Sequence, residues 1–217
     1  YNSFAGNLPP ELERDKFTRL RDAIEEGFGK APISYRAGRY GLGPASKAIL
    51  QDNGIRVDTS VRAFFDYSAQ DGPNYENFPN HPYWVSRDPD LLELPVTSVY
   101  RGALASSGPS LFPKLTRIPR APGIASRTGL LERVRMTPEG TPLRAAKKAV
   151  DAALEAGLPI MVLSFHSPSL APGNTPYTRT DAEVDRLYDW LQGVYEHMGA
   201  KGITPTTVEH IWAAASN

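Results

Sequence analysis

Three polar side chains stand directly after segments that have the composition of short strands: Arg36, Asp58 and His166. In sheets and barrels of parallel strands, side chains at the carboxyl ends of the strands converge on the ligand site. We therefore expect these three side chains to share one cleft. An imidazole in such a cleft can act as a general acid, and a carboxylate on its other ring nitrogen fixes the tautomer and favours the charged, proton-donating form. Asp58 in contact with His166 fits that description.

Each of these residues also has a simpler interpretation. His166 could be a histidine whose ring is satisfied by backbone groups, Asp58 could form a turn after its strand, and Arg36 could take part in a surface ion pair. Their coincidence at three strand ends favours a functional site. The Gly-rich segment 38–43 could suggest a phosphate loop, but no Lys-Ser or Lys-Thr pair follows it and Pro44 lacks an N–H, which favours a tight turn.

The composition excludes several classes of protein. The 217 residues are 41% apolar, which suits one globular domain over residues 1–217 with a substantial core. Lysine plus arginine (24) equals aspartate plus glutamate (24), so no net field would attract nucleic acid. The chain has no cysteine, which excludes disulfides, thiolate nucleophiles and cysteine zinc sites. No apolar run approaches the ~20 residues that a membrane span requires.

The elements that must position these residues alternate between helix and strand. This order is the signature of an α/β fold, which usually has parallel strands covered by helices. The segment 158–165 is the most apolar run, as expected for a strand buried on both faces of a sheet. From apolar periodicity and helix-start and helix-stop signals we predict helices over 10–28, 44–53, 142–156, 180–201 and 208–215, and strands over 33–36, 55–58, 91–96, 158–165 and 203–208.

Two segments are predicted to be loops. Residues 64–95 are rich in proline, asparagine, aspartate and aromatic side chains, Trp84 among them, and return through the apolar strand at 91–96. Loops of that length in a compact domain are usually functional or ordered by their own packing. Residues 105–142 also have loop character because prolines recur along them.

Three motifs of the chain resemble those of a known family. They are residues 35–41 (Tyr-Arg-Ala-Gly-Arg-Tyr-Gly), 54–61 (Gly-Ile-Arg-Val-Asp-Thr-Ser-Val) and 163–168 (Leu-Ser-Phe-His-Ser-Pro). In order and spacing they resemble the third, fourth and fifth motifs of the polysaccharide deacetylases, carbohydrate esterases that remove N- or O-acetyl groups. The resemblance runs from about residue 10 to the end of the sequence. It implies an α/β fold of the distorted (β/α) barrel type.

The resemblance implies a role for each matched residue. Arg36 would orient the carboxylate of the catalytic base, Asp58 would tune the catalytic histidine, and His166 would be the general acid that protonates the departing amine or alcohol. Leu163 would line the small pocket for the acetyl methyl group, and Tyr40 would stand in the adjacent wall of the groove. All five would therefore belong to one site.

The chain also departs from the family's pattern. Gly38 stands where a proline is frequent, and Asp58-Thr59-Ser60 replaces the usual pairing of Asp and Trp. The family's paired aspartates and its two-histidine motif, which together provide the base and the divalent-metal ligands, are absent, and no two of the four histidines have i, i+4 spacing. The resemblance thus implies a divalent metal ion, such as zinc, whose ligands are not in this chain. It also implies a barrel incomplete at its N-terminus, completed by a missing N-terminal segment or a second chain.

The leading hypothesis is a hydrolase that removes acetyl groups from an N- or O-acetylated poly- or oligosaccharide by metal-activated water, with His166 as general acid. Trp84 could stack on a sugar ring or pin its own loop to the core. The alternative is a non-catalytic, carbohydrate-binding relative that keeps the groove. A fragment of an unrelated α/β hydrolase is a third interpretation. Nucleic acid is not an expected partner.

Overall fold

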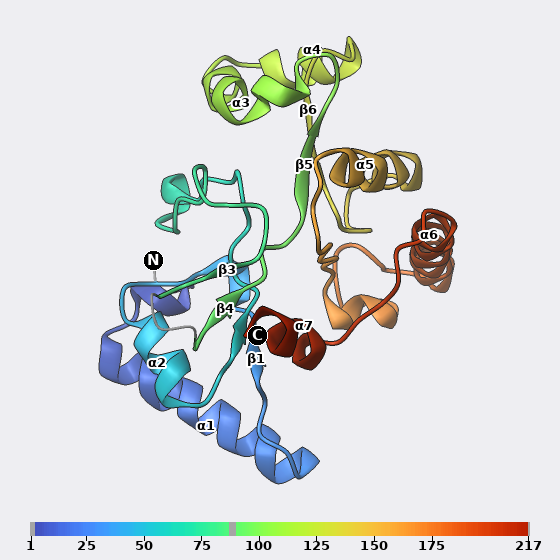
Figure 1. The fold of residues 1–217 in the computed structure, drawn as a ribbon. Helices are drawn as coiled ribbons and strands as arrows, with labels where there is room; N and C mark the ends of the chain where they lie inside the picture. Colours follow the sequence, from blue (N-terminus) through green and yellow to red (C-terminus); the bar gives the residue numbers. More distant parts are fainter. Residues whose placement is uncertain (1–2, 87–89, 217) are drawn as a thin grey trace. The chain divides into compact units, whose positions relative to one another are not determined.

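The computed structural model describes residues 3–86 and 90–216, which form two compact units (Figure 1). The first unit consists of Tyr1–Val96 with Thr206–Asn217, and the second of Thr97–Pro205. Each unit mixes helices with a small sheet and has its own apolar core, which confirms the α/β class. The described residues close no barrel, and the (β/α) barrel stays a prediction. The single domain over residues 1–217 stays a prediction.

The first unit is built on a four-stranded sheet of very short strands. Its strand order is β1-β2-β4-β3, with β1, β2 and β4 parallel and β3 antiparallel to β4. Three of the predicted strands are thereby confirmed, in shortened form. The strands are β1 (Ser34–Tyr35), β2 (Val57–Asp58), β3 (Tyr83–Trp84) and β4 (Leu92–Glu93).

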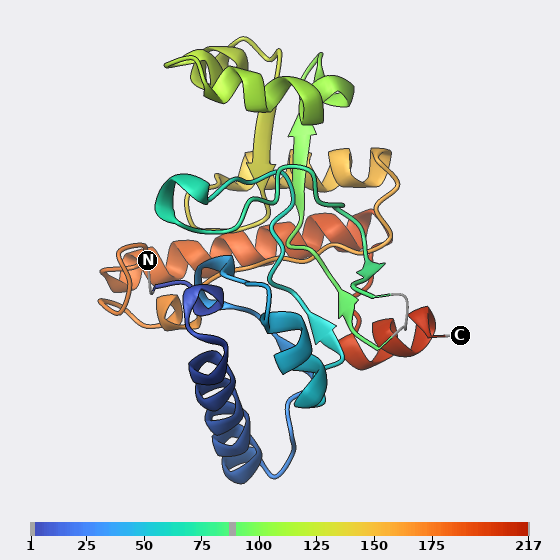
Figure 2. The ribbon, with the colours of Figure 1, turned by 90° about the vertical axis from the view of Figure 1, so that its left-hand side faces the viewer.

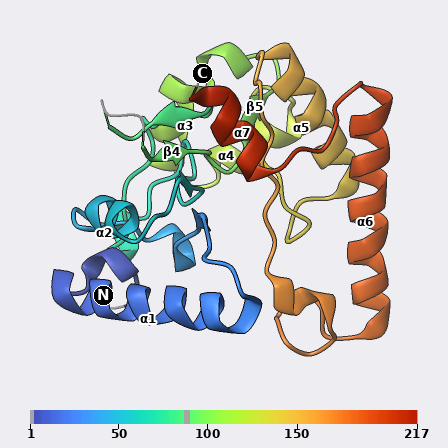
Figure 3. The same ribbon diagram turned by 60° about the horizontal axis from the view of Figure 1, so that its bottom comes forward.

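Helices of the first unit begin and end where local signals place them. α1 has Pro10 at its first position and ends at Gly29, whose φ of 69° lets its N–H close the last turn on the Glu25 carbonyl at 2.8 Å. α2 lies beside α1 (Figures 1 and 3). α7 belongs to this unit, where Arg56 lies 4.8 Å from the ring centroid of Trp212. The helices are α1 (Pro10–Phe28), α2 (Ser46–Asp52) and α7 (Val208–Ala215).

A compact apolar core supports the strand ends of the first unit. Leu50, Ile55 and Leu91 form its buried centre, and Phe17 packs its ring edge-on against Tyr35 with centroids 5.1 Å apart. This packing holds the ends of β1 and β2, where Arg36 and Asp58 lie.

The second unit packs one helix against an antiparallel pair of strands and a second, longer helix against the first. β5 (Ser98–Arg101) and β6 (Glu132–Arg135) pair along their length, and Figure 2 shows them as neighbouring arrows leading to α3 (Gly108–Thr116) and α4 (Ala121–Arg127). The other side chains of its core come from α5 (Leu143–Glu155) and α6 (Asp181–Ala200). The buried core residues are Val99, Val134, Met136, Ala146, Ala149, Val150, Ala153, Trp190, Val194 and Met198.

The prediction of a loop over 105–142 is wrong, because this segment contains α3, α4 and β6. Prolines suggested a loop, yet Pro109 and Pro122 lie in the first turn of α3 and α4, where a missing N–H costs no helical hydrogen bond. Phe112, Ala125 and Leu131 form a separate small apolar cluster, which packs the helices of this segment together.

The predicted strands over 158–165 and 203–208 are also wrong: neither segment is assigned as a strand. The first is only partly paired, with the Thr97 N–H donating to the Val162 carbonyl and the Ser164 N–H to the Met136 carbonyl, both at 3.1 Å. Its apolar composition reflects packing of side chains such as Leu163 against the core of the second unit. Such packing does not require a continuous ladder of hydrogen bonds.

Candidate functional site

His166 in the second unit is held by a carboxylate that comes from a different loop. It precedes a short 3-10 turn, Ser167–Leu170, while Glu139 lies in the turn between β6 and α5. The His166 Nδ1 lies 2.7 Å from one Glu139 oxygen, and the His166 backbone N–H donates to the other at 2.9 Å. Since a carboxylate only accepts, Nδ1 carries the hydrogen and Nε2 is the nitrogen available for proton exchange.

The two partners differ sharply in exposure. The Glu139 side chain is 7% exposed and the His166 side chain 63%. Ser169 Oγ also donates to Glu139 at 3.0 Å, so the buried carboxylate accepts three hydrogen bonds. The imidazole stacks on Tyr177 with ring centroids 5.7 Å apart and 15° between the planes. The result is an oriented, solvent-accessible imidazole, which suits general acid–base chemistry.

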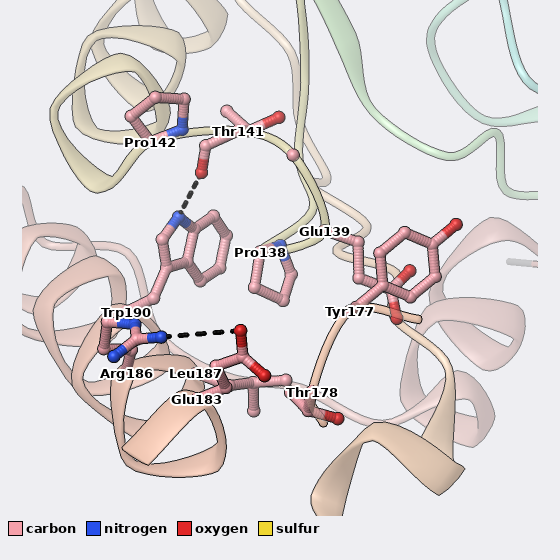
Figure 4. A pocket seen from close by; sticks show the side chains of 11 residues that line it. Pro138, Glu139, Thr141, Pro142, Tyr177, Thr178, Glu183, Arg186, Leu187 and Trp190 are labelled. Atoms are coloured by element: carbon pink, nitrogen blue, oxygen red, sulfur yellow. Dashed lines mark hydrogen bonds and ion pairs between the residues drawn. The ribbon is translucent and has the colours of Figure 1, made fainter. Parts of the chain in front are cut away.

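A pocket of about 470 Å³ adjoins this pair (Figure 4). Glu139 and Tyr177 line the pocket and also contact His166, so the pocket reaches the imidazole through them. One wall is the turn before α5, and the other is the first half of α6. The lining residues are Pro138, Glu139, Gly140, Thr141, Pro142, Tyr177, Thr178, Glu183, Arg186, Leu187 and Trp190.

The first unit holds a second group of titratable side chains. Asp58 and Glu93 end the neighbouring parallel strands β2 and β4 and are register partners. Both are buried, at 2% and 1% exposure, and their carboxyl groups bond to each other. Ser60 N–H donates to Asp58 at 3.0 Å, and Val61 N–H donates to Glu93 at 3.0 Å. Two buried carboxyl groups thus lie side by side at the carboxyl ends of β2 and β4.

Burial sets the proton affinity of this acid pair. It raises the pKa of Asp58 to about 6, although hydrogen bonds from Ser60 oppose the rise. Burial and the charge of Asp58 raise the pKa of Glu93 well above its ordinary value. Burial therefore favours the protonated form of both carboxyl groups, and the two titrate as a coupled pair.

Arg36 lies near this acid pair. Its charge lowers the pKa of Glu93, against the larger effect of burial. Its Nε donates to Thr59, at 3.2 Å to the carbonyl and 2.9 Å to the hydroxyl oxygen. Arg36 and Asp58 thus lie in the first unit and His166 in the second. The contact of Asp58 with His166, and the shared cleft, stay predictions.

The three predicted substrate-binding residues have packing roles in the structure. Tyr40 stacks on Tyr67 with centroids 6.0 Å apart and has the guanidinium of Arg62 4.9 Å from its ring centroid. Trp84 is half-buried in β3, and Leu163 packs against the core of the second unit. Substrate contacts by Tyr40, Trp84 and Leu163 stay predictions.

Sequence reasoning missed Glu139 and Glu93. Glu93 carried a usable signal, since it is a lone acid inside the apolar run 91–96 and a buried acid in a strand calls for a partner. Glu139 had a weaker signal, a Pro-Glu-Gly turn at 138–140 just before a helix. Nothing local links it to a histidine 27 positions away.

The structure shows no binding site among residues 3–86 and 90–216 for the metal ion that the family resemblance implies. No group of three or more His, Cys, Asp or Glu side chains there could hold a metal ion. The divalent metal therefore stays a prediction. In the same described ranges, no helix is long and apolar enough to cross a membrane.

Among solved structures, the chain is similar to a crystal structure of another protein. No family model and no curated protein matches the chain. The solved structure is a crystal structure described as a "putative polysaccharide deacetylase" from Mycobacterium smegmatis, with 22% sequence identity and a TM-score of 0.40. The match covers 92% of this chain and 60% of that one, so the chain spans less than two thirds of that structure's length.

Proposed function

We propose that the protein is a hydrolase of the polysaccharide deacetylase kind, acting on acetylated poly- or oligosaccharides with His166 as general acid. The observation that carries the proposal is the His166–Glu139 pair, in which a buried carboxylate lies 2.7 Å from Nδ1 of an exposed imidazole. The motifs at 35–41, 54–61 and 163–168 support the choice of substrate through their resemblance to that family.

The pair supplies the proton that the reaction needs. Hydrolysis adds water to the acetyl carbonyl and breaks its C–N or C–O bond, which yields acetate and a free amine or alcohol. Nε2 of the imidazolium gives its proton to the departing nitrogen or oxygen, while Glu139 holds Nδ1–H and stabilises the charged ring beforehand. The proton is regained from the attacking water, so the imidazole ends as it began.

The resemblance also implies a divalent metal such as zinc, a (β/α) barrel and acid-side roles for Arg36 and Asp58, and these remain parts of the proposal. The described residues offer no ligand cluster for the metal, so we derive no step through it. In the proposal, its ligands come from a further N-terminal segment or a second chain. The hydrogen-bonded acid pair of Asp58 and Glu93 supports a proton-handling role for Asp58.

Acetate release tests the proposal. Partially N-acetylated chitosan oligomers and O-acetylated xylan are incubated with the protein, together with the segment or second chain that carries the metal ligands, in the presence of Zn²⁺, Co²⁺ or Mg²⁺, and acetate is measured. His166→Ala should lower the rate by about 10²- to 10⁴-fold, the usual contribution of a general acid. His210→Ala is the matched control, because that histidine is exposed on α7 in the first unit. Full activity in His166→Ala would rule out its role.

The pocket favours a second candidate function, a carbohydrate-binding protein without hydrolysis. A pocket of about 470 Å³ with apolar walls and a few polar groups has the size and character of a small-ligand site whatever chemistry follows. Saccharide binding with no acetate released under any of the metals would favour this candidate.

A further inference from the structure

The pocket between the turn at 138–142 and α6 offers apolar rings and unused polar groups together (Figure 4). Trp190 presents only its ring, because its N–H donates to the Thr141 carbonyl at 2.8 Å. The Arg186 side chain is 66% exposed and has one ion-pair partner in the described chain, Glu183 at 3.7 Å. Most of its five N–H donors are thus open to a ligand.

The charges of the pocket favour a neutral ligand. Glu139 and Glu183 oppose a single guanidinium, so an anion would meet a net negative wall. Both Glu139 oxygens are engaged by His166, and one Glu183 oxygen accepts from the N–H groups of Arg179 and Thr180. The second Glu183 oxygen, beside Arg186, remains as an acceptor. A carboxylate oxygen of Glu183 next to the N–H donors of Arg186 can bind two neighbouring hydroxyl groups of a ligand, one as donor and one as acceptor.

Tyr177 connects the pocket with the imidazole. Its side chain is 48% exposed, lines the pocket and stacks on His166. An aromatic face beside planar polar groups can take the C–H face of a ring while its hydroxyls are bonded at the edge. A ligand placed here lies next to the proton donor.

We infer that this pocket binds one sugar ring of the substrate, packed on Tyr177 and bonded through its hydroxyl groups to Arg186 and Glu183. The inference rests on the proposed function and deepens it, since it assigns the substrate contacts to the turn before α5, Tyr177 and α6. It adds contacts beyond Tyr40, Trp84 and Leu163.

Binding and turnover measured separately test the inference. Binding of N,N′-diacetylchitobiose is followed by calorimetry and saturation-transfer NMR, and acetate release from acetylated chitotetraose gives kcat and KM. Tyr177→Leu and Arg186→Gln should each raise the Kd for the disaccharide about tenfold, as expected when a stacking surface or a charged hydrogen bond is lost. KM should rise more than kcat falls, which a purely structural role would not produce.

Two exposed residues serve as matched controls. Tyr195→Leu on α6 and Arg144→Gln on α5 remove the same kinds of side chain outside the pocket and should leave Kd and KM unchanged. Circular dichroism checks that all four variants fold, which their exposed side chains favour.

The outcomes separate this inference from the proposed function. If both pocket variants bind and turn over like the wild type, or the wild type binds no saccharide, the sugar pocket is wrong. In the first case acetate release still supports the hydrolase. If the wild type binds the disaccharide, the pocket variants bind it tenfold more weakly and no acetate appears, the pocket stands and the hydrolase does not.

Discussion

At the scale of single residues, the identity of the carboxylate beside His166 matters most. This carboxylate belongs to Glu139, whose Oε2 lies 2.7 Å from the His166 Nδ1. Glu139 lies in a turn outside the three motifs that resemble those of the family. Because Glu139 also accepts from the His166 backbone N–H and from Ser169, it fixes both the ring and the loop that carries it. Orientation of the imidazole therefore depends on one buried acid.

Glu139→Gln should lower acetate release at least tenfold. A glutamine keeps the size of the side chain but cannot stabilise a charged imidazolium, and its amide can present an N–H to Nδ1 and select the wrong tautomer. Loss of a charged hydrogen-bond acceptor should also lower the free energy of unfolding by about 1.5–3 kcal/mol. Steady-state kinetics and urea unfolding measure the two effects.

Glu196→Gln is the control, because Glu196 is exposed on α6. Equal rates for Glu139→Gln and the wild type would show that the pair does not position the catalytic ring.

The acid pair predicts a pH dependence of stability. Burial raises the pKa of Asp58 to about 6, above its unfolded value near 3.8. Between these pH values the folded state binds a proton that the unfolded state has released, so the free energy of unfolding should increase as the pH falls from 7 to 4.5, by on the order of 2 kcal/mol. Burial and the charge of Asp58 also raise the pKa of Glu93, so this group contributes to the dependence in the same direction.

Glu93→Gln should weaken this dependence. An amide in place of the protonated acid can donate to Asp58 and accept from Val61 without titrating. Urea unfolding at pH 5 and pH 8 measures the difference, with Glu11→Gln on the exposed face of α1 as control. A wild type whose stability falls between pH 7 and pH 5 would contradict the prediction.

At the scale of elements, the contact of α5 with α6 depends on a glycine. A Cβ added at Gly193 would lie 2.8 Å from the Leu143 side chain, so the helices approach closely at this point. Gly193→Val should lower the free energy of unfolding by about 1–3 kcal/mol through overpacking.

Gly199→Ala on the same helix is the matched control, since a Cβ there meets nothing within 4 Å. It should raise stability by up to about 1 kcal/mol through helix propensity. Thermal unfolding measures both variants, and equal melting temperatures for the two would refute the close approach.

At the scale of the whole molecule, the second unit should fold alone. Residues 97–205 are contiguous and contain the complete buried core formed by β5, β6, α5 and α6. The fragment should therefore show helical circular dichroism and a cooperative thermal transition. A fragment without a cooperative transition would show that its core needs the rest of the chain.

The helices over 10–28, 180–201 and 208–215 were predictable, because their signals are local. Pro10 and Gly29 bound the first, and the capping box of Thr180 with Glu183 begins the second. The strand signals likewise placed Arg36 directly after β1 and Asp58 at the end of β2. Local sequence failed for 158–165, where apolar content was interpreted as a buried strand.

The sequence by itself determined the helices over 10–28, 44–53, 142–156, 180–201 and 208–215, the absence of cysteine chemistry and the place of a histidine after an apolar run. Tertiary structure alone decided that Glu139 holds this histidine and that the carboxyl group of Asp58 lies against that of Glu93. The reason is physical: helix signals act over three or four residues, whereas these pairs join positions 27 and 35 apart in the sequence. Only the path of the folded chain brings them within hydrogen-bond distance.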